Sequence, residues 1–116
     1  MHLSADFRVI NVEETSYQGV VRLKMESQSG FFLVLEYPKD AVGVNIKQGN
    51  NIRISISNDR DPNYVTNWDV YMSGVVYYVS EGLVKISIGG LILDINNFKD
   101  EARIGEKVYI GLKLIR

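Results

Sequence analysis

Hydrophobic and polar residues alternate with a period of two along most of the chain. The clearest series of alternate apolar positions are Ile52, Ile54 and Ile56, and then Val108, Ile110, Leu112 and Leu114. Successive side chains of a β-strand point to opposite faces, so this period predicts strands with one buried face rather than helices. The strands expected on this basis cover residues 5–13, 21–26, 31–37, 52–57, 70–80, 84–88, 91–95 and 108–114.

Short polar or glycine-bearing links separate most of these segments, as is typical of hairpin turns. They are residues 16–19, 28–30, 48–51 and 81–82. Three connections are longer, namely 38–47, 58–69 and 96–105. The first and third have room for a turn or two of helix, whereas 58–69 holds the most polar stretch and is expected to be a mobile loop. The sequence shows no internal repeat.

About eight short strands without long helices must close into a barrel or pair into a sandwich. An immunoglobulin sandwich is disfavoured because the lone Trp68 lies in a polar connection and the chain has no cysteine. We therefore expect an all-β fold, a small antiparallel barrel with the alternate residues named above pointing inward. Gly74 and the pair Gly89 and Gly90 fall within strand-like segments, where glycines often mark bulges or bends at barrel corners.

The composition fits a single globular domain over residues 1–116. Its mass is 13.1 kDa and its net charge is −1, a balance that argues against binding duplex DNA by phosphate neutralisation. The absence of cysteine and a single histidine, His2, argue against structural zinc, thiol catalysis and a Ser-His-Asp triad. No apolar run reaches the ~20 residues that span a bilayer, so we expect a soluble, cytoplasmic protein without a membrane partner.

Sequence motifs that carry chemistry are missing. No segment fits a phosphate-binding loop, and Gly89–Gly90 is too weak a signal for a dinucleotide site. Asp59 and Asp61 offer two carboxylates to a cation, but calcium loops supply more oxygen ligands, so a solvated turn is favoured. We therefore expect no catalytic residue, metal site, cofactor or small-molecule substrate.

The segment 70–80 is apolar on both faces and carries Tyr71, Tyr77 and Tyr78. Such a strand is either covered on both sides or meets another protein on one side. Alternatively, its rings stack single-stranded bases while lysine and arginine follow the backbone. The near-neutral net charge favours the core-plus-interface interpretation over base stacking.

Three parts of the chain, taken together, resemble one protein family. The first comprises Phe7–Val12 and Arg22–Ser29, similar to that family's opening strand and its Arg-Leu-x-x-Glu-Ser-x-Ser second strand. The second is Val70–Val79, similar to a Met-x-Gly-x-Val-Tyr strand. The third is Ile86–Leu93, similar to Ser-x-Gly-Gly-Leu-Leu, followed by Lys107–Ile110, where the family has Val-Tyr-Leu. In order and spacing, the chain resembles the eighth small subunit of archaeal and eukaryotic DNA-directed RNA polymerase.

The resemblance implies an oligonucleotide-binding-type (OB-type) β-barrel that is a non-catalytic polymerase subunit docked mainly on the largest subunit. The short connections 58–69 and 81–82 suit the compact archaeal form. We expect Gly89, Gly90 and Leu91, with Tyr77 or Tyr78, to contact the largest subunit, because paired glycines leave the backbone accessible and tyrosines are enriched in interface cores. Contact with nucleic acid is expected to be weak or indirect.

Two other function classes fit the sequence less well. A free-standing OB-fold protein that binds single-stranded nucleic acid is the alternative, on fold analogy alone. A small hydrolase or metal enzyme has almost no support from the residues present.

Overall fold

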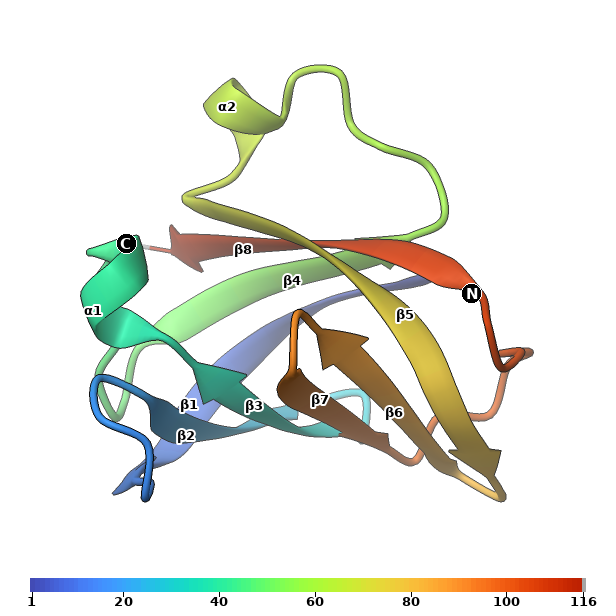
Figure 1. Ribbon diagram of the computed structural model, residues 1–116, viewed down its shortest axis with the longest axis horizontal. Coiled ribbons are helices and arrows are strands. Elements are labelled where there is room, and N and C mark those ends of the chain that lie inside the picture. Colours follow the sequence, from blue (N-terminus) through green and yellow to red (C-terminus); the bar gives the residue numbers. More distant parts are fainter. Residues whose placement is uncertain (116) are drawn as a thin grey trace.

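The computed structural model, which describes residues 1–115, contains eight β-strands and two single-turn helices (Figure 1). In chain order these elements are β1 (Leu3–Glu14), β2 (Val21–Ser27), β3 (Phe32–Tyr37), α1 (Lys39–Val42), β4 (Asn51–Ser57), α2 (Tyr64–Asn67), β5 (Val70–Ser80), β6 (Leu83–Ile88), β7 (Leu91–Asn96) and β8 (Lys107–Ile115). Each strand predicted from the period of two is present, with bounds that differ from the prediction by at most two residues.

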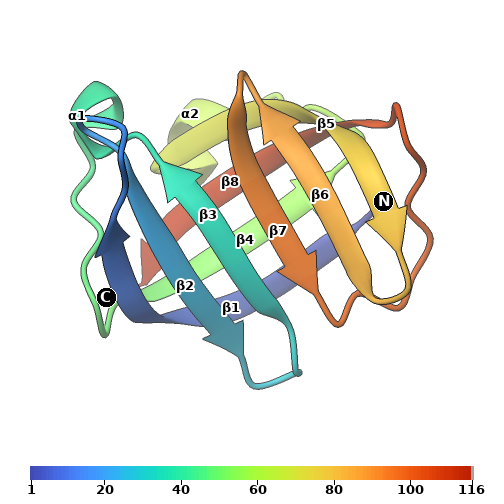
Figure 2. The same ribbon diagram turned by 60° about the horizontal axis from the view of Figure 1, so that its bottom comes forward.

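The strands close into one barrel in the order β1-β2-β3-β7-β6-β5-β8-β4. Every pair is antiparallel, including the pair of β4 with β1 that completes the ring. Figure 2 shows β2, β3, β7 and β6 side by side on one wall, with β1, β4 and β8 crossing behind them. The predicted small antiparallel β-barrel of about eight strands is confirmed, and its closure leaves none of the described strands with a free edge.

Apolar side chains from all eight strands fill the barrel, and none of the buried residues among 1–115 is polar or charged. Of the residues predicted to point inward, all are buried except Leu114, which is partly buried and packs against the core near the end of β8. The buried set is Leu3, Phe7, Val9, Val21, Leu23, Met25, Leu33, Leu35, Tyr37, Ile46, Ile52, Ile54, Ile56, Val70, Val76, Val84, Ile86, Leu93, Ile95, Phe98, Val108, Ile110 and Leu112.

The strand order consists of two Greek keys. In the first, β1, β2 and β3 form a meander and β4 returns to pair with β1. In the second, β5, β6 and β7 form a meander and β8 returns to pair with β5. Each half thus has the spatial order 4-1-2-3 that defines the motif. The β3–β7 and β4–β8 pairs join the two halves into one barrel.

Each half also has a β-bulge at the same place. The register between β1 and β2 shifts between Val9 and Asn11, and that between β5 and β6 shifts between Val76 and Tyr78. In both halves the residue before the shift makes two further backbone hydrogen bonds, to the turn that precedes the fourth strand. The four bonds are Val9 N to Asn50 O (2.9 Å), Gly49 N to Val9 O (2.8 Å), Val76 N to Glu106 O (2.9 Å) and Gly105 N to Val76 O (2.7 Å).

The repeat extends to the register between the halves. When the two halves are aligned at their bulges and matched residue by residue along the strand pairs, Val34 in β3 is the equivalent of Asp94 in β7. These two equivalent residues also pair with each other in the barrel. Likewise Ser55 in β4 occupies the position of Gly111 in β8, and these two also pair. A two-fold axis through both walls produces this arrangement. The chain therefore has an internal repeat of topology and register that its residue identities do not reveal.

The helical turns are placed differently from the expectation. One, α1, lies in the connection after β3, as expected. The other, α2, lies in 58–69 rather than in 96–105. The third connection instead folds inward, because the buried Phe98 anchors it and its amide donates to the Gly82 carbonyl at 3.2 Å. Phe98 lies just beyond the predicted strand, so the two-residue period could not show its burial.

We predict that Ile54→Ala lowers the free energy of unfolding by about 2–4 kcal/mol, because Ile54 is 1% exposed and the deletion leaves a cavity. Urea denaturation followed by circular dichroism measures this change. The neighbouring Ser55→Ala, on the outer face, is the matched control and is expected to stay within about 0.5 kcal/mol of the parent. An Ile54→Ala variant as stable as the parent would contradict the inward orientation.

We also predict a loss of stability at alkaline pH that depends on Tyr37. Its hydroxyl donates to the Val44 carbonyl at 2.6 Å, and burial raises the pKa of Tyr37 from 10.0 to about 12. The folded state then holds the phenol proton more tightly than the unfolded chain, so stability from this group is complete below pH 10 and is lost between pH 10 and about 12. Denaturant titrations of the parent and of Tyr37→Phe across this range measure the effect, which the variant should lack. Parallel curves would contradict the assignment.

Candidate protein interface

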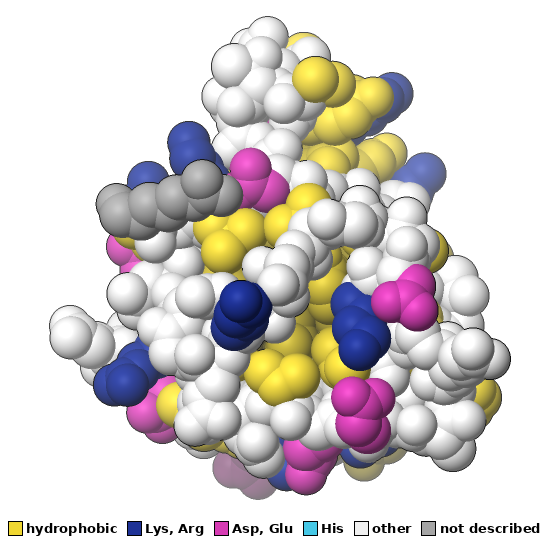
Figure 3. Space-filling view, turned by 90° about the vertical axis from the view of Figure 1, so that its left-hand side faces the viewer, with side chains coloured by type: hydrophobic (Ala, Val, Ile, Leu, Met, Phe, Trp, Pro, Cys, Tyr) yellow, Lys and Arg dark blue, Asp and Glu magenta, His cyan; other side chains and the backbone are white. Residues whose placement is uncertain are grey.

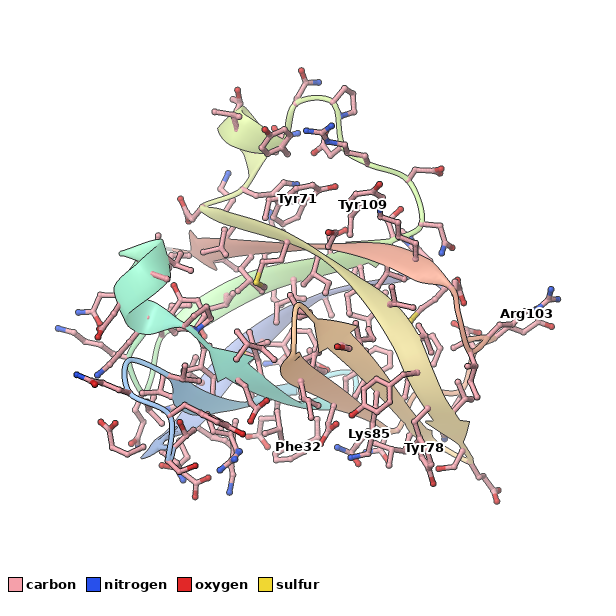
Figure 4. All side chains as sticks on the ribbon, in the orientation of Figure 1. Phe32, Tyr71, Tyr78, Lys85, Arg103 and Tyr109 are labelled. Carbon is pink, nitrogen blue, oxygen red and sulfur yellow. The ribbon has the colours of Figure 1, made fainter. Side chains whose placement is uncertain are left out.

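The connection 58–69 folds back over the beginning of β5 and the middle of β8. Tyr64 in α2 stacks on Tyr71 of β5 with 5.2 Å between ring centroids, and Tyr71 stacks on Tyr109 of β8 at 6.1 Å. Figure 4 shows Tyr71 and Tyr109 beside each other beneath this connection. Side-chain contacts therefore attach the connection 58–69 to the barrel, although its polar sequence predicted a mobile loop.

Trp68 packs directly on the backbone of β8. A Cβ atom at Gly111 would lie 2.4 Å from the Trp68 ring, so only glycine leaves room for it. The indole N–H donates to Asp61 Oδ2 at 3.0 Å, and the Asn67 amide donates to the same oxygen at 2.9 Å. Hydrogen bonds from Asn67, the Asn63 backbone and Trp68 lower the pKa of Asp61. Asp61 was considered as a cation ligand from the sequence, and in the structure its carboxylate accepts hydrogen bonds from within the connection 58–69.

Cations occupy both outer faces of the tyrosine stack. The Arg60 guanidinium lies 5.0 Å from the Tyr64 ring centroid, and Lys107 Nζ lies 5.4 Å from that of Tyr109. These distances are within the range of cation–π contacts. Base stacking requires an open ring face, so this cluster serves as an internal contact.

The end of β5 carries an uncovered apolar surface, the β5 strip, formed by Val75, Tyr77, Tyr78 and Val79. Their exposed fractions are 45%, 42%, 44% and 36%. The bulge after Val76 adds a residue to this strand, so the in–out alternation is lost and both tyrosines face outward. The apolar strand predicted to be covered on both sides or to meet a protein is covered near its start and uncovered near its end.

β6 and β7 continue this surface with one ion pair. Tyr78 pairs with Lys85, which in turn pairs with Asp94, and Lys85 Nζ lies 3.3 Å from Asp94 Oδ1. That oxygen is shielded from solvent and accepts no hydrogen bond from residues 1–115, so the Lys85 charge compensates it. Figure 4 shows Tyr78, Lys85 and Phe32 along one side of the barrel, away from Tyr71 and Tyr109.

In the first half, the positions equivalent to Val75, Tyr77, Tyr78 and Val79 hold Arg8, Ile10, Asn11 and Val12, and a cluster of ion pairs lies beside them. Glu13 lies 3.3 Å from Lys24 and 3.7 Å from Arg22, and Arg22 lies 3.9 Å from Glu36. These residues come from β1, β2 and β3, the counterparts of β5, β6 and β7. Of the four equivalent residues in the first half only Arg8 is exposed, so the exposed apolar strip belongs to the second half.

Gly89 and Gly90 form the two-residue turn between β6 and β7, since Ile88 pairs with Leu91. Their φ angles of 58° and 98° are positive, as a type I′ turn requires. The expectation that this pair lies inside a strand is wrong, because the turn ends one strand and begins the next. Gly74 does lie within β5. A Cβ at Gly89 or Gly90 would meet nothing within 4 Å, so the turn is open on its outer side.

The five residues proposed from the sequence fall in two places on the same meander. Gly89, Gly90 and the half-buried Leu91 lie at the turn that ends β6 and begins β7. Figure 3 shows one side of the molecule, where hydrophobic side chains gather in the middle and charged side chains lie around them. Tyr77 and Tyr78 lie toward the opposite end of β6. Six residues of strand span about 20 Å, and a standard interface of about 800 Å² per partner is about 30 Å across. An interface of standard size is therefore large enough to cover both places.

Residues 1–115 contain no group of three or more His, Asp or Glu placed to hold a metal ion. They also contain no helix with the length and apolar character needed to cross a membrane. What the described surface offers is an exposed apolar area of the kind that contacts another macromolecule.

Two contacts of this surface were not found from the sequence. The Lys85–Asp94 pair joins neighbouring strands, and its register depends on the turn at Gly89–Gly90. The Trp68–Gly111 contact had one signal, a glycine inside the apolar strand 108–114, since such glycines often mark a close approach of another group.

We predict that Gly111→Ala displaces Trp68 and detaches the connection 58–69. Trp68 is the single tryptophan, so a red shift of its fluorescence and faster proteolysis within 58–69 report the change directly. Ser73→Ala, an exposed position on the outer face of β5, is the control and should leave both readouts unchanged. Unaltered fluorescence in Gly111→Ala would show that Trp68 does not depend on the missing Cβ.

No protein-family model matches this chain, and no curated protein matches its sequence.

Proposed function

We propose that this protein is a non-catalytic small subunit of DNA-directed RNA polymerase that docks on the largest subunit and supports transcription in the cytoplasm. The observation that carries the proposal is the β5 strip, an exposed apolar surface on an otherwise closed and polar barrel. The resemblance of the chain to the eighth small polymerase subunit supports the choice of partner.

The physical case for docking rests on the β5 strip itself. Two tyrosines and two valines stay about two-fifths exposed although each half of the barrel has a complete core. Interface cores are enriched in tyrosine and depleted in charge, and the strip has both properties. The equivalent positions of the first half hold Arg8, Ile10, Asn11 and Val12, so the barrel does not require exposed tyrosine rings at this place.

The type I′ turn at Gly89–Gly90 belongs to the same proposed surface. It leaves backbone N–H and C=O groups of the turn unshielded by side chains. Leu91 follows the turn directly and is half-buried. We therefore place the docking surface along β6, with the β5 strip running beside this strand and the glycine turn at its end.

A free-standing protein that binds single-stranded nucleic acid is the competing function. Tyr77 and Tyr78 favour it, because their exposed rings lie beside Lys85. Two observations argue against nucleic-acid binding, namely the net charge of −1 and the cations that cover the stack of Tyr64, Tyr71 and Tyr109. Salt-sensitive, submicromolar binding of short oligonucleotides by the isolated chain would select this function over docking.

We predict that Tyr78→Glu weakens incorporation into the polymerase. Truncating or charging an interface tyrosine costs about 2 kcal/mol, or roughly thirtyfold in affinity. The matched control is Tyr17→Glu, because Tyr17 is 64% exposed in the β1–β2 turn, outside the proposed surface. Competition between tagged variant and untagged parent for the host's largest subunit measures the ratio. Circular dichroism establishes that both variants melt at the temperature of the parent.

Equal incorporation of Tyr78→Glu and Tyr17→Glu would contradict the proposed docking surface. A charged residue at Gly90 is a poorer probe, because its φ of 98° strains any side chain and confounds docking with folding. Failure of the parent chain to associate with the largest subunit would overturn the proposed function.

A further inference from the structure

The turn that precedes β8, residues 103–106, carries an exposed isoleucine. The side chain of Ile104 is 69% exposed, although it is apolar and β-branched. Figure 4 shows its neighbour Arg103 projecting away from the barrel. Single exposed apolar residues are common on protein surfaces, so the position of Ile104 matters more than its exposure.

This turn is attached to the bulge of β5. The Gly105 amide donates to the Val76 carbonyl at 2.7 Å, and the Val76 amide donates to the Glu106 carbonyl at 2.9 Å. In the barrel β5 lies between β6 and β8, so the turn lies on the side of β5 opposite to β6. Ile104 is therefore next to the corner at which Tyr77 faces outward, and it extends the exposed apolar surface beyond the β5 strip.

Hydrogen bonds hold the turn in one conformation. Glu106 Oε1 accepts from the Arg103 amide at 2.9 Å, and Glu106 Oε2 accepts from the side-chain amide of Asn58 at 2.7 Å. The same Asn58 nitrogen also donates to the Lys107 carbonyl at 3.0 Å. A surface that is already ordered loses little conformational entropy when a partner covers it. Ile104 is thus presented to a partner in a fixed position.

The internal repeat shows that the fold does not require an apolar residue here. In both halves a turn makes two backbone hydrogen bonds to the residue before the bulge. In the first half this turn is residues 47–50, and Gln48 has the position of Ile104. Tyr77 and its counterpart Ile10 show a related difference, since Tyr77 is exposed and Ile10 is half-buried. Exposed apolar side chains therefore gather at the second corner and not at the first.

The surroundings of Ile104 favour a folded protein surface as the partner. Closure of the barrel leaves no described strand free to pair with an added strand. Ile104 offers no ring face for base stacking, and a phosphate backbone requires an excess of positive charge. The exposed charges of this connection balance instead, and they are Lys99, Asp100, Glu101 and Arg103. An apolar residue on a projecting turn with charges around it matches an interface anchor, which fills a pocket inside a polar rim.

We propose that Ile104 inserts into an apolar pocket of the largest polymerase subunit and anchors the docking surface at the β5 corner. This inference rests on the proposed function and adds a contact residue to it. The docking surface then extends to both sides of β5, with β6 on one side and the turn 103–106 on the other. Neighbouring strands lie about 5 Å apart, so an interface about 30 Å across covers this width.

The test is Ile104→Gln, which introduces the residue found in the other half. We expect incorporation into the polymerase to weaken about tenfold, because an interface anchor loses its apolar contacts. Ile104→Leu keeps an apolar side chain and is expected to stay within about threefold of the parent. The matched control is Val65→Gln, because Val65 is 78% exposed on α2, near the other end of β5. Competition between tagged variant and untagged parent for the host's largest subunit measures each ratio, and circular dichroism establishes equal melting temperatures.

A second measurement reports contact directly. The chain has no cysteine, so Arg103→Cys carries a single thiol beside Ile104. We expect its maleimide labelling to slow about tenfold on assembly with the largest subunit, as nine-tenths occupancy implies, and labelling of Val65→Cys to be unchanged. Protection of Arg103→Cys in the isolated chain by a single-stranded oligonucleotide would instead identify a nucleic-acid contact and overturn the proposal.

The outcomes separate this anchor from the proposed function. If Ile104→Gln assembles as well as Val65→Gln while Tyr78→Glu is impaired, the anchor is wrong and docking through the β5 strip stands. Unchanged labelling of Arg103→Cys in the assembled complex leads to the same conclusion. Failure of the parent chain to associate with the largest subunit overturns the proposed function and the anchor together.

Discussion

Backbone pairing on both sides of every described strand is the constraint on which the rest of this structure depends. A short sheet closes only if its strands bend, and here the bend is concentrated at two bulges, after Val9 and after Val76. Each bulge is fixed from outside by a turn whose glycine, Gly49 or Gly105, adopts φ near +90°. The interior that receives the apolar side chains exists only because these two corners hold.

Because the barrel is closed and filled by core side chains, contacts with other molecules are confined to its outer surface. The interior is a shared apolar core, and no polar or charged residue among 1–115 is buried. The outer surfaces of the two halves differ, because Tyr77, Tyr78 and Val79 are exposed in the second half whereas their counterparts Ile10, Asn11 and Val12 are half-buried in the first. The bulge at Tyr77 illustrates the coupling, because the residue that bends the barrel also turns an aromatic ring toward solvent. The bend of the strand and the exposed aromatic surface arise from the same local irregularity.

The sequence predicted the strands well because a half-buried strand alternates residue by residue, as Ile52 to Ile56 do. It predicted separate strands on either side of Gly89 and Gly90, but it described the two glycines as a bend within a strand-like segment, because residue type alone does not distinguish such a bend from a two-residue turn. Trp68 on Gly111 and Lys85 on Asp94 depend on register between distant or turn-linked segments. The residues of the proposed docking surface were chosen by residue type. That Tyr77 and Tyr78 lie apart from Gly89 and Gly90 follows only from how the strands pair.

The paired positions at the centre of each wall have one more consequence. In a dimer of two identical half-barrels, the residue at Val34 and Asp94 would face its own copy, and so would the residue at Ser55 and Gly111. Two aspartates at the position of Val34 and Asp94 would repel each other. At the position of Ser55 and Gly111, a residue larger than glycine in both copies would leave no room for the Trp68 indole. Because the two halves are parts of one chain, the two residues of each such pair need not be identical. An acid now stands opposite valine and a glycine opposite serine, and each wall carries a combination that a symmetric assembly forbids.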